Sequence, residues 1–238
     1  AIFREGKECA MLQVQNVSKS YASGSKNREQ ILSDVELSIA ENETVAFLGK
    51  SGSGKSTLAE IICGLTPPDS GNVFWQNEPL YGKNMRYDRK RASHIKMITQ
   101  QPISAFDPKQ SFRSALIEVI TASDRTCSKQ EALKRIYRIF ETVGLERDIL
   151  SRKPSAVSGG QAQRAAIARA LVTDPKLLIC DEATAMLDLT AQAKVINLIK
   201  KIKEERGLSV LLITHDKALA EALGDRSYII ENKHIREI

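Results

Sequence analysis

Nine residues from Gly49 to Thr57, GKSGSGKST, have the types and spacing of a loop that binds phosphate. Glycines let the backbone wrap a phosphate without interference from a Cβ atom, and the following helix start directs free N–H groups at its oxygens. Lys55 adds a positive charge for the β- and γ-phosphates, and the Ser56 hydroxyl is a ligand for Mg²⁺. An apolar run precedes the loop and a helical pattern follows it, so a nucleoside triphosphate site is predicted. Its predicted residues are Gly49, Lys50, Ser51, Gly52, Ser53, Gly54, Lys55, Ser56 and Thr57.

A second stretch, LLICDEAT, is an apolar strand that ends in two carboxylates, Asp181 and Glu182. Ligands of open α/β sheets bind at the carboxyl ends of the strands, so both acids are expected near the phosphate loop. Asp181 is predicted to hold the Mg²⁺ shell, and Glu182 to accept a proton from the attacking water as general base. Gln100 follows another expected strand and could reach Mg²⁺ or that water. His215, directly after the run LLIT, could contact the γ-phosphate.

The stretch VSGGQAQRAAIARAL, residues 157–171, contains a second glycine-rich helix start. Its residues Ser158, Gly159, Gly160 and Gln161 lead directly into a helical pattern rich in alanine and arginine. A helix start of this kind presents unpaired backbone N–H groups and is therefore a second candidate anion site. The pattern alone leaves open whose phosphate this site would read.

The elements that must position these residues alternate between strand and helix, which predicts a largely parallel sheet. In DVELSIA, Val35, Leu37 and Ile39 alternate with polar residues, as in a half-buried antiparallel strand. The middle of the chain is predicted to be helical, and SKQEALKRIYRIFETVGL opens with a capping box of Ser128 and Glu131. A helix from about Thr190 to Arg206, a further strand and a terminal hairpin are expected in the last third. The helical middle is thus predicted to be an insertion into an α/β core.

The composition is that of an ordinary globular protein, with 42% hydrophobic residues and a net charge of +6. The basic residues are interpreted as scattered, without the interleaved aromatics of a nucleic-acid groove, so no nucleic-acid partner is predicted. A mild positive charge also suits nucleotide binding and work beside an anionic membrane face. No run approaches the roughly 18 apolar residues that span a bilayer. The four cysteines lack metal-site spacing and indicate reduced thiols in a cytoplasmic protein. Residues 1–10 are expected to be a leader or a cloning remnant.

Taken in order, these motifs resemble those of the nucleotide-binding subunit of an ABC transporter. The order is a phosphate loop, a glutamine loop, SGGQ on a helix start, LLICDE, an LD turn and a strand-end histidine. The resemblance runs from about Leu12 to the end, and SGGQ is its most specific part. It implies an α/β fold: a P-loop NTPase core with a mainly parallel sheet, an N-terminal antiparallel β subdomain and an inserted helical subdomain. The implied ABC ATPase domain is 11–238, with the core and antiparallel strands at about 11–99 and 165–238 and the helical subdomain at about 100–164.

The resemblance also implies a role for the second helix start. In such proteins two subunits pack head to tail, and the signature Ser158–Gln161 of one covers the γ-phosphate bound by the other. ATP with Mg²⁺ closes the dimer, and hydrolysis with phosphate loss opens it. Tyr21 matches the aromatic residue that stacks on adenine, and Asp188 matches the D-loop aspartate at the dimer interface. Gln100 matches the glutamine that senses Mg²⁺ and touches the membrane partner, and His215 matches the switch histidine.

The chain departs from the usual family pattern in three places. Thr99 and Gln101 stand where Phe and Asp are common around the glutamine loop, and Val157 stands where Leu usually begins the signature. Ala185 and Met186 replace the Ser-Ala of the D-loop, which bears on how tightly hydrolysis is coupled between the two sites. None of these departures removes a predicted catalytic group.

QQPISAFDPKQSF is similar to the segment after the glutamine loop in ATPases of the peptide and nickel importers. The short C-terminus is closer to the ATPases of nickel and metal–chelate importers. This resemblance implies a second ABC ATPase subunit, homologous or identical, and two transmembrane permease subunits. It also implies an extracytoplasmic substrate-binding protein as an indirect partner, and a location on the cytoplasmic face of the cell membrane. The transported substrate would be a nickel or metal–chelate species or a peptide.

Other classes of protein remain open at this point. A soluble ABC ATPase acting on DNA or ribosomes usually has two ATPase halves or a long coiled-coil insertion, and this chain has neither. A small-molecule phosphotransferase would not need SGGQ. An ABC exporter ATPase shares all of these motifs, and dependence on a binding protein would distinguish an importer from it.

Overall fold

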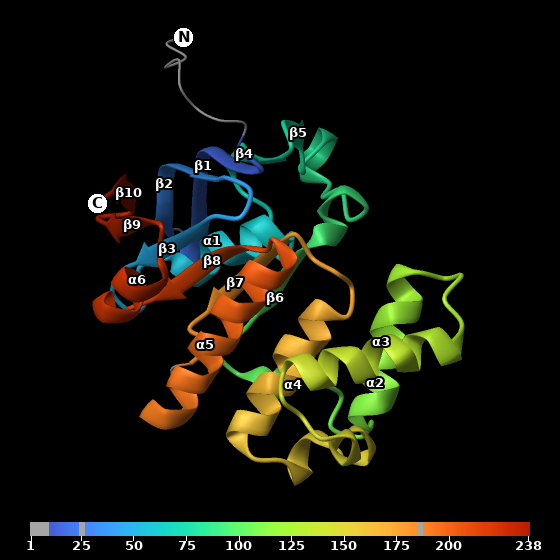
Figure 1. Cartoon of the computed structure of the whole chain (residues 1–238). Helices are drawn as coiled ribbons and strands as arrows, with labels where there is room; N and C mark the ends of the chain where they lie inside the picture. Colours follow the sequence, from blue (N-terminus) through green and yellow to red (C-terminus); the bar gives the residue numbers. More distant parts are fainter. Residues whose placement is uncertain (1–9, 24–26, 185–187) are drawn as a thin grey trace.

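The computed structural model describes residues 10–23, 27–184 and 188–238 (Figure 1). An antiparallel sheet with the strand order β2–β1–β4–β5 comes from the first part of the chain. The alternating run at Val35, Leu37 and Ile39 lies in β2 with all three side chains buried, as predicted. The strands of this sheet are β1 Leu12–Ser23, β2 Asn27–Ile39, β4 Ser70–Trp75 and β5 Glu78–Pro79.

The main sheet has the strand order β10–β9–β3–β8–β7–β6, and its central strands are parallel. Among the described strands of this sheet, β10 alone runs antiparallel to its neighbour, β9, which confirms the predicted terminal hairpin. Its strands are β3 Thr44–Leu48, β6 Ile95–Ile98, β7 Leu177–Asp181, β8 Ser209–Thr214, β9 Arg226–Glu231 and β10 His234–Glu237. Because β3, β6, β7 and β8 are parallel, the phosphate loop, Gln100, Glu182 and His215 follow strand ends at the same edge.

The helices cover both faces of the main sheet. They are α1 Lys55–Cys63, α2 Phe112–Ser123, α3 Lys129–Thr142, α4 Gly159–Leu171, α5 Leu189–Arg206 and α6 Lys217–Leu223. Short 3₁₀ turns are η1 Lys83–Met85, η2 Arg91–His94, η3 Pro102–Ala105, η4 Arg147–Ser151 and η5 Pro154–Ala156. The predicted capping box of α3 is present: Ser128 Oγ accepts from Glu131 N at 3.2 Å, and Glu131 Oε2 accepts from Ser128 N at 3.0 Å. The exact limits of a helical subdomain at 100–164 stay a prediction.

Strand β7 contributes to the two large clusters of the hydrophobic core because its side chains alternate between the faces of the sheet. Leu177 and Ile179 pack with α1 and the antiparallel sheet. Leu178 and Cys180 pack on the other face with α2, α3, α4 and α5, and burial raises the pKa of the Cys180 thiol to about 12. Each fully buried large side chain in these clusters contributes roughly 1.5–3 kcal/mol. The helices of the middle region therefore continue one side of the sheet's own core, as Figure 1 shows for α4 and α5.

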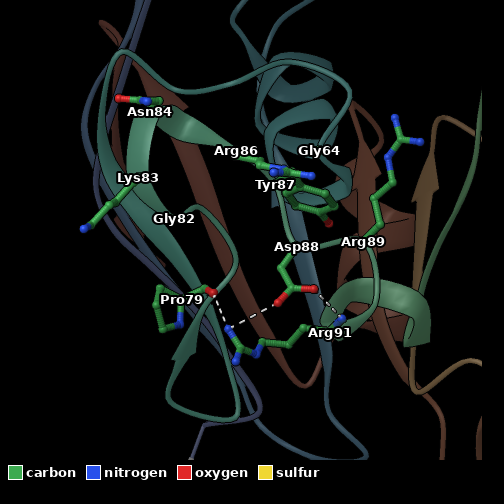
Figure 2. A pocket seen from close by; sticks show the side chains of 10 residues that line it. All are labelled: Gly64, Pro79, Gly82, Lys83, Asn84, Arg86, Tyr87, Asp88, Arg89 and Arg91. Carbon is green, nitrogen blue, oxygen red and sulfur yellow. Dashed lines mark hydrogen bonds and ion pairs between the residues drawn. The ribbon is translucent and has the colours of Figure 1, made fainter.

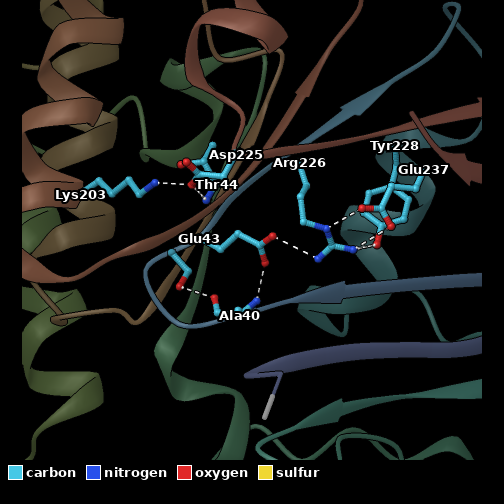
Figure 3. A network of polar contacts seen from close by, with 9 residues as sticks. Ala40, Glu43, Thr44, Lys203, Asp225, Arg226, Tyr228 and Glu237 are labelled. Carbon is cyan, nitrogen blue, oxygen red and sulfur yellow. Dashed lines mark hydrogen bonds and ion pairs between the residues drawn. The ribbon is translucent and has the colours of Figure 1, made fainter. Parts of the chain in front are cut away.

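A polar network joins the C-terminal strands to the start of the main sheet (Figure 3). Arg226 pairs with Glu237 at 2.7 Å and with Glu43 at 3.1 Å, and it also contacts the Tyr228 hydroxyl. These acids raise the pKa of the Arg226 guanidinium. Beside it, Asp225 accepts from Lys203 Nζ at 2.6 Å and from a backbone N–H of β3 at 2.7 Å. In the part of the chain that the structure describes, no helix combines the length and apolar character that crossing a membrane requires.

Candidate nucleotide site

The phosphate loop lies between β3 and α1 and is held in shape by its own lysine. Lys55 is 4% exposed, and its Nζ donates to the carbonyls of Gly49 at 2.8 Å and Lys50 at 2.9 Å. Gly54 precedes α1 with φ 105, and a Cβ there would lie 2.8 Å from Ile31 Cγ2, so only glycine fits without strain. The first turn of α1 contains no acid that would occupy its free N–H groups. Lys55 and Gly54 therefore fix the shape of the loop, and the first turn of α1 keeps its N–H groups available for an anion.

A cavity of about 290 Å³ opens in front of this loop. It gathers most of the residues predicted for ATP binding and catalysis, and Tyr21, 41% exposed, stands at it on strand β1. The lysine of the same strand, Lys19, lies 5.4 Å from the centre of the Tyr21 ring. The cavity is lined by Tyr21, Ile31, Ser51, Gly52, Gly54, Lys55, Ser56, Thr57, Gln100, Asp181 and Glu182.

Asp181, at the end of β7, is a buried carboxylate with one oxygen atom that lacks a hydrogen-bond partner in the part of the chain that the structure describes. Its residue is 7% exposed, and its Oδ1 atom has no hydrogen-bond partner among the described residues. Burial raises the pKa of Asp181 and the charge of Glu182 adds to this, while a hydrogen bond from Ser56 opposes it. A cation beside this oxygen would remove the cost of keeping the carboxylate ionised.

The residues around Asp181 suit Mg²⁺. Mg²⁺ prefers hard oxygen ligands and is usually held by one or two carboxylates together with phosphate oxygens and water. Asp181 supplies the carboxylate, Ser56 supplies a hydroxyl in contact with it, and the phosphate loop would supply the phosphates. Gln100 lines the same cavity from the segment after β6.

Glu182 is the point at which three other predicted residues meet. Its carboxylate lies 3.9 Å from Lys55 Nζ and 3.4 Å from His215 Nδ1. The Gln100 amide donates to it at 3.4 Å. Glu182 also has φ 47, a left-handed conformation that a non-glycine residue rarely adopts, and its backbone N–H donates to the Ile213 carbonyl at 3.0 Å. The fold thus holds this carboxylate at the sheet edge with strained backbone.

The second glycine-rich helix start, at α4, lies apart from this cavity. Ser158 Oγ accepts from Gln161 N at 3.3 Å, and Gln161 Oε1 accepts from Ser158 N at 3.0 Å. This is a capping box, so the two side chains satisfy each other. Nothing lies within 4 Å of where a Cβ would stand at Gly159 or Gly160. The structure therefore presents this helix start to open space and does not bring it to the chain's own phosphate loop.

Asp188 is placed as the N-cap of α5, where its carboxylate accepts from Ala191 N at 2.9 Å. A cap of this kind is a sufficient structural reason for an aspartate here. The neighbouring departures from the family pattern, Ala185 and Met186, lie outside the described residues. Sequence reasoning missed Ile31, which packs on the phosphate loop and lines the cavity. Nothing in the local pattern of β2 distinguishes it, because its contact is with Gly54, on another segment of the chain.

Comparison with known proteins agrees with this geometry. Residues 32–185 match the family model described as ABC transporter, and the chain belongs to that family. Among curated relatives, the nickel import ATP-binding protein NikE of Shigella dysenteriae serotype 1 (strain Sd197) is 40% identical over 95% of this chain and 86% of its own length. NikE of Escherichia coli (strain K12) is 39% identical over the same shares.

Among solved structures, the ATP-binding cassette MJ0796, in a dimeric post-hydrolysis state bound to ADP and Pi, superposes with a TM-score of 0.83. It shares 32% identity and covers 96% of this chain and 98% of its own. CbiO1 from Clostridium perfringens, part of the ABC transporter complex cbiONQ, has a TM-score of 0.80 and 26% identity over 96% and 88%. The sequence prediction of an ABC ATPase is confirmed, and so is the predicted P-loop NTPase fold class. The chain is an ATP-binding cassette ATPase.

Proposed function

We propose that this ATPase drives an ABC importer for nickel or a metal chelate, with a peptide as the other substrate class. The observation that carries the proposal is the pair of glycine-rich helix starts, one enclosed by a lysine and two acids, the other open and distant from them. A head-to-tail dimer would bring the open start of one subunit onto the ATP of the other. The identity with nickel import ATP-binding proteins supports the branch.

In the proposed cycle, the phosphate loop and Lys55 hold the phosphates, and Tyr21 stacks on adenine. Asp181 and Ser56, with Gln100, would hold Mg²⁺, which would neutralise phosphate charge. Glu182 takes a proton from the attacking water, and His215 contacts the γ-phosphate. Lys55, Gln100 and His215 all lie within 3.9 Å of the Glu182 carboxylate, which places the proposed base beside the groups proposed to contact the phosphates and the water.

The open helix start takes its part only in the dimer. Ser158 and the N–H groups after it, with Gly159, Gly160 and Gln161, would contact the partner's γ-phosphate, and Asp188 would lie at the interface. ATP binding then closes the dimer, and hydrolysis with phosphate release opens it. The proposed partners are a second ABC ATPase, homologous or identical, two permeases, and an extracytoplasmic binding protein reached indirectly. The chain would work on the cytoplasmic face of the membrane.

The test is capture of the tagged chain from gently solubilised membranes of its native cell, followed by mass spectrometry and nickel-uptake assays. Two permeases, a second ATPase and a binding protein, with ATP-dependent nickel uptake lost in cells without this chain, are expected. Recovery with ribosomes or DNA from the soluble fraction would overturn the transport role in favour of a soluble ABC ATPase. Transport independent of any binding protein would point to an exporter.

A further inference from the structure

A second hollow, of about 1000 Å³, lies at the far end of α1 from the phosphate loop (Figure 2). It is formed mainly by residues 83–91, the basic segment, which connects β5 to β6. Within nine residues this segment holds five Lys or Arg and one acid, Asp88, in a chain whose net charge is +6. The basic residues of the chain are thus less scattered than the sequence analysis supposed.

Most of the charge on the basic segment is unused by the fold. Arg91 is occupied, since it donates to the Pro79 carbonyl at 2.9 Å and pairs with Glu78 at 3.4 Å and Asp88 at 3.6 Å. The remaining cations are exposed and make no salt bridge within the described part of the chain. These are Lys83, Arg86, Arg89 and Lys90.

The basic segment is nevertheless fixed in place. The Tyr87 hydroxyl donates to the Ile62 carbonyl at 2.6 Å, and its ring lies against Gly64 at the end of α1. A Cβ at Gly64, which has φ 71, would lie 2.2 Å from that ring, so glycine is required for this contact. The backbone N–H of Asp88 donates to Leu80 O at 2.8 Å. Four free cations are therefore presented on an anchored segment, which lowers the ordering cost of binding.

The arrangement of these cations selects the kind of partner. Figure 2 shows Lys83, Arg86 and Arg89 extending in different directions rather than converging on one point, which suits many anions spread over a surface. Met85 within the segment is 38% exposed, and Leu65, next to Gly64, is 70% exposed. Exposed apolar side chains among cations are typical of contact with lipid headgroups. Within the basic segment the aromatic residue is Tyr87, and its ring covers Gly64 and is not free to stack on bases, which disfavours nucleic acid.

We propose that the basic segment, residues 83–91, is a contact site for anionic lipid headgroups. Juxtamembrane cations are attracted to acidic lipids with a strength that falls as salt rises, and each contributes about fivefold to binding. This inference goes beyond the proposed function, because vesicle binding needs neither ATP nor a permease. Either proposal can fail while the other stands.

The experiment measures co-sedimentation of the full chain with vesicles of phosphatidylethanolamine and phosphatidylglycerol, and with vesicles of phosphatidylcholine alone. Binding to the anionic vesicles that weakens with salt is expected, and the double variant Arg86→Gln/Arg89→Gln should lower it by about tenfold or more. The matched control Lys194→Gln/Lys200→Gln removes equal charge from exposed positions on α5, on the opposite face of the sheet, and should lower it much less. Unchanged thermal melting and ATPase activity confirm that both variants are folded.

Each of the following results would overturn the proposal. The first is equal binding to neutral and anionic vesicles. The second is equal loss in the α5 control, which would mean that overall charge and not this segment is responsible. The third is displacement by inorganic phosphate beyond that caused by chloride at the same ionic strength, or preferential binding of RNA, since either identifies a different ligand. Arg86→Lys/Arg89→Lys should retain binding, because a lipid surface reads charge and not the guanidinium fork.

Discussion

The two glycine-rich helix starts differ in what the fold has placed around them. At α1 the loop meets a buried lysine, an aspartate with one oxygen atom unpaired among the described residues and a glutamate with strained backbone within one cavity. At α4 the Ser158 and Gln161 side chains satisfy each other, and the glycines face open space. The first helix start has polar groups beside it that lack a partner within the described part of the chain, whereas the side chains at the second helix start satisfy each other's hydrogen bonds. This difference supports the proposal that the first start binds nucleotide within a single chain, while the second meets an anion only in the dimer.

The largest effect on the difference between the two helix starts is expected from Glu182→Gln, which removes the proposed base from the first site and keeps the shape of that site. ATP hydrolysis by the assembled complex should fall by about 10²–10⁴-fold, because proton abstraction is lost while the phosphate contacts remain. ATP binding, measured by equilibrium dialysis with Mg²⁺, should be retained. A variant that hydrolyses ATP at the wild-type rate would exclude Glu182 as the base.

Lys55→Ala should weaken ATP binding by about a hundredfold or more, because charge-assisted hydrogen bonds to phosphate are among the strongest in proteins. The same variant loses the two hydrogen bonds that shape the loop. Lys50→Ala, which removes an exposed lysine of the same loop, is the matched control and should cost less than tenfold. Equal losses in the two variants, by calorimetric titration, would mean that only loop charge matters.

Ser158→Arg fills the open space at the second helix start. Nucleotide binding by the isolated chain should be unchanged, since this start does not line the cavity. ATP hydrolysis and transport by the complex should fall at least tenfold, because the bulky side chain keeps the partner's phosphate away. If the isolated chain loses ATP binding while its melting temperature is unchanged, the second start acts within its own chain.

The order of the motifs was enough to predict the fold class, and Asp181, Glu182, Gln100 and His215 could be placed near one another because each lies at or just after the end of an apolar strand. Parallel pairing then brings those strand ends together: Asp181 and His215 needed only the register of β7 and β8. Ile31 could not be predicted, since its contact is with Gly54, which lies on a different segment of the chain and comes near only in the folded structure. The left-handed backbone conformation of Glu182 could not be predicted either, because glutamate is not one of the residue types, such as glycine or asparagine, that favour this conformation.

Asp181→Asn and Ser158→Ala are smaller changes that should have opposite signs. Burial raises the pKa of Asp181, so its ionised form lowers the stability of the folded, nucleotide-free chain at neutral pH. The asparagine variant should therefore unfold at a higher temperature without nucleotide, by an amount on the order of 1 kcal/mol, and should gain less from ATP with Mg²⁺. The difference should disappear at acid pH, where the wild-type carboxyl is protonated in both states. A lower melting temperature at neutral pH would contradict the raised pKa.

Ser158→Ala removes the acceptor that caps α4 and should lower the free energy of unfolding by about 1 kcal/mol. Urea unfolding of the nucleotide-free chain measures this directly. Ser123→Ala, near the end of α2, removes a hydroxyl that bonds only the preceding turn of its helix and is the control. Equal effects would show that the capping box of α4 contributes nothing particular to stability.

Helix α4 begins at the open, glycine-rich start, and the buried side of the helix is largely alanine: Ala162, Ala165, Ala166, Ala168 and Ala170. Alanine has no side-chain rotamers that interdigitate with neighbouring residues, so this surface of α4 is smooth and opposes sliding less than a surface of large side chains would. Small sliding of packed helices is one of the common ways in which proteins change shape. We expect sliding of α4 along its alanine surface, rather than bending at a hinge, to determine how readily the start of α4 can approach another molecule's phosphate.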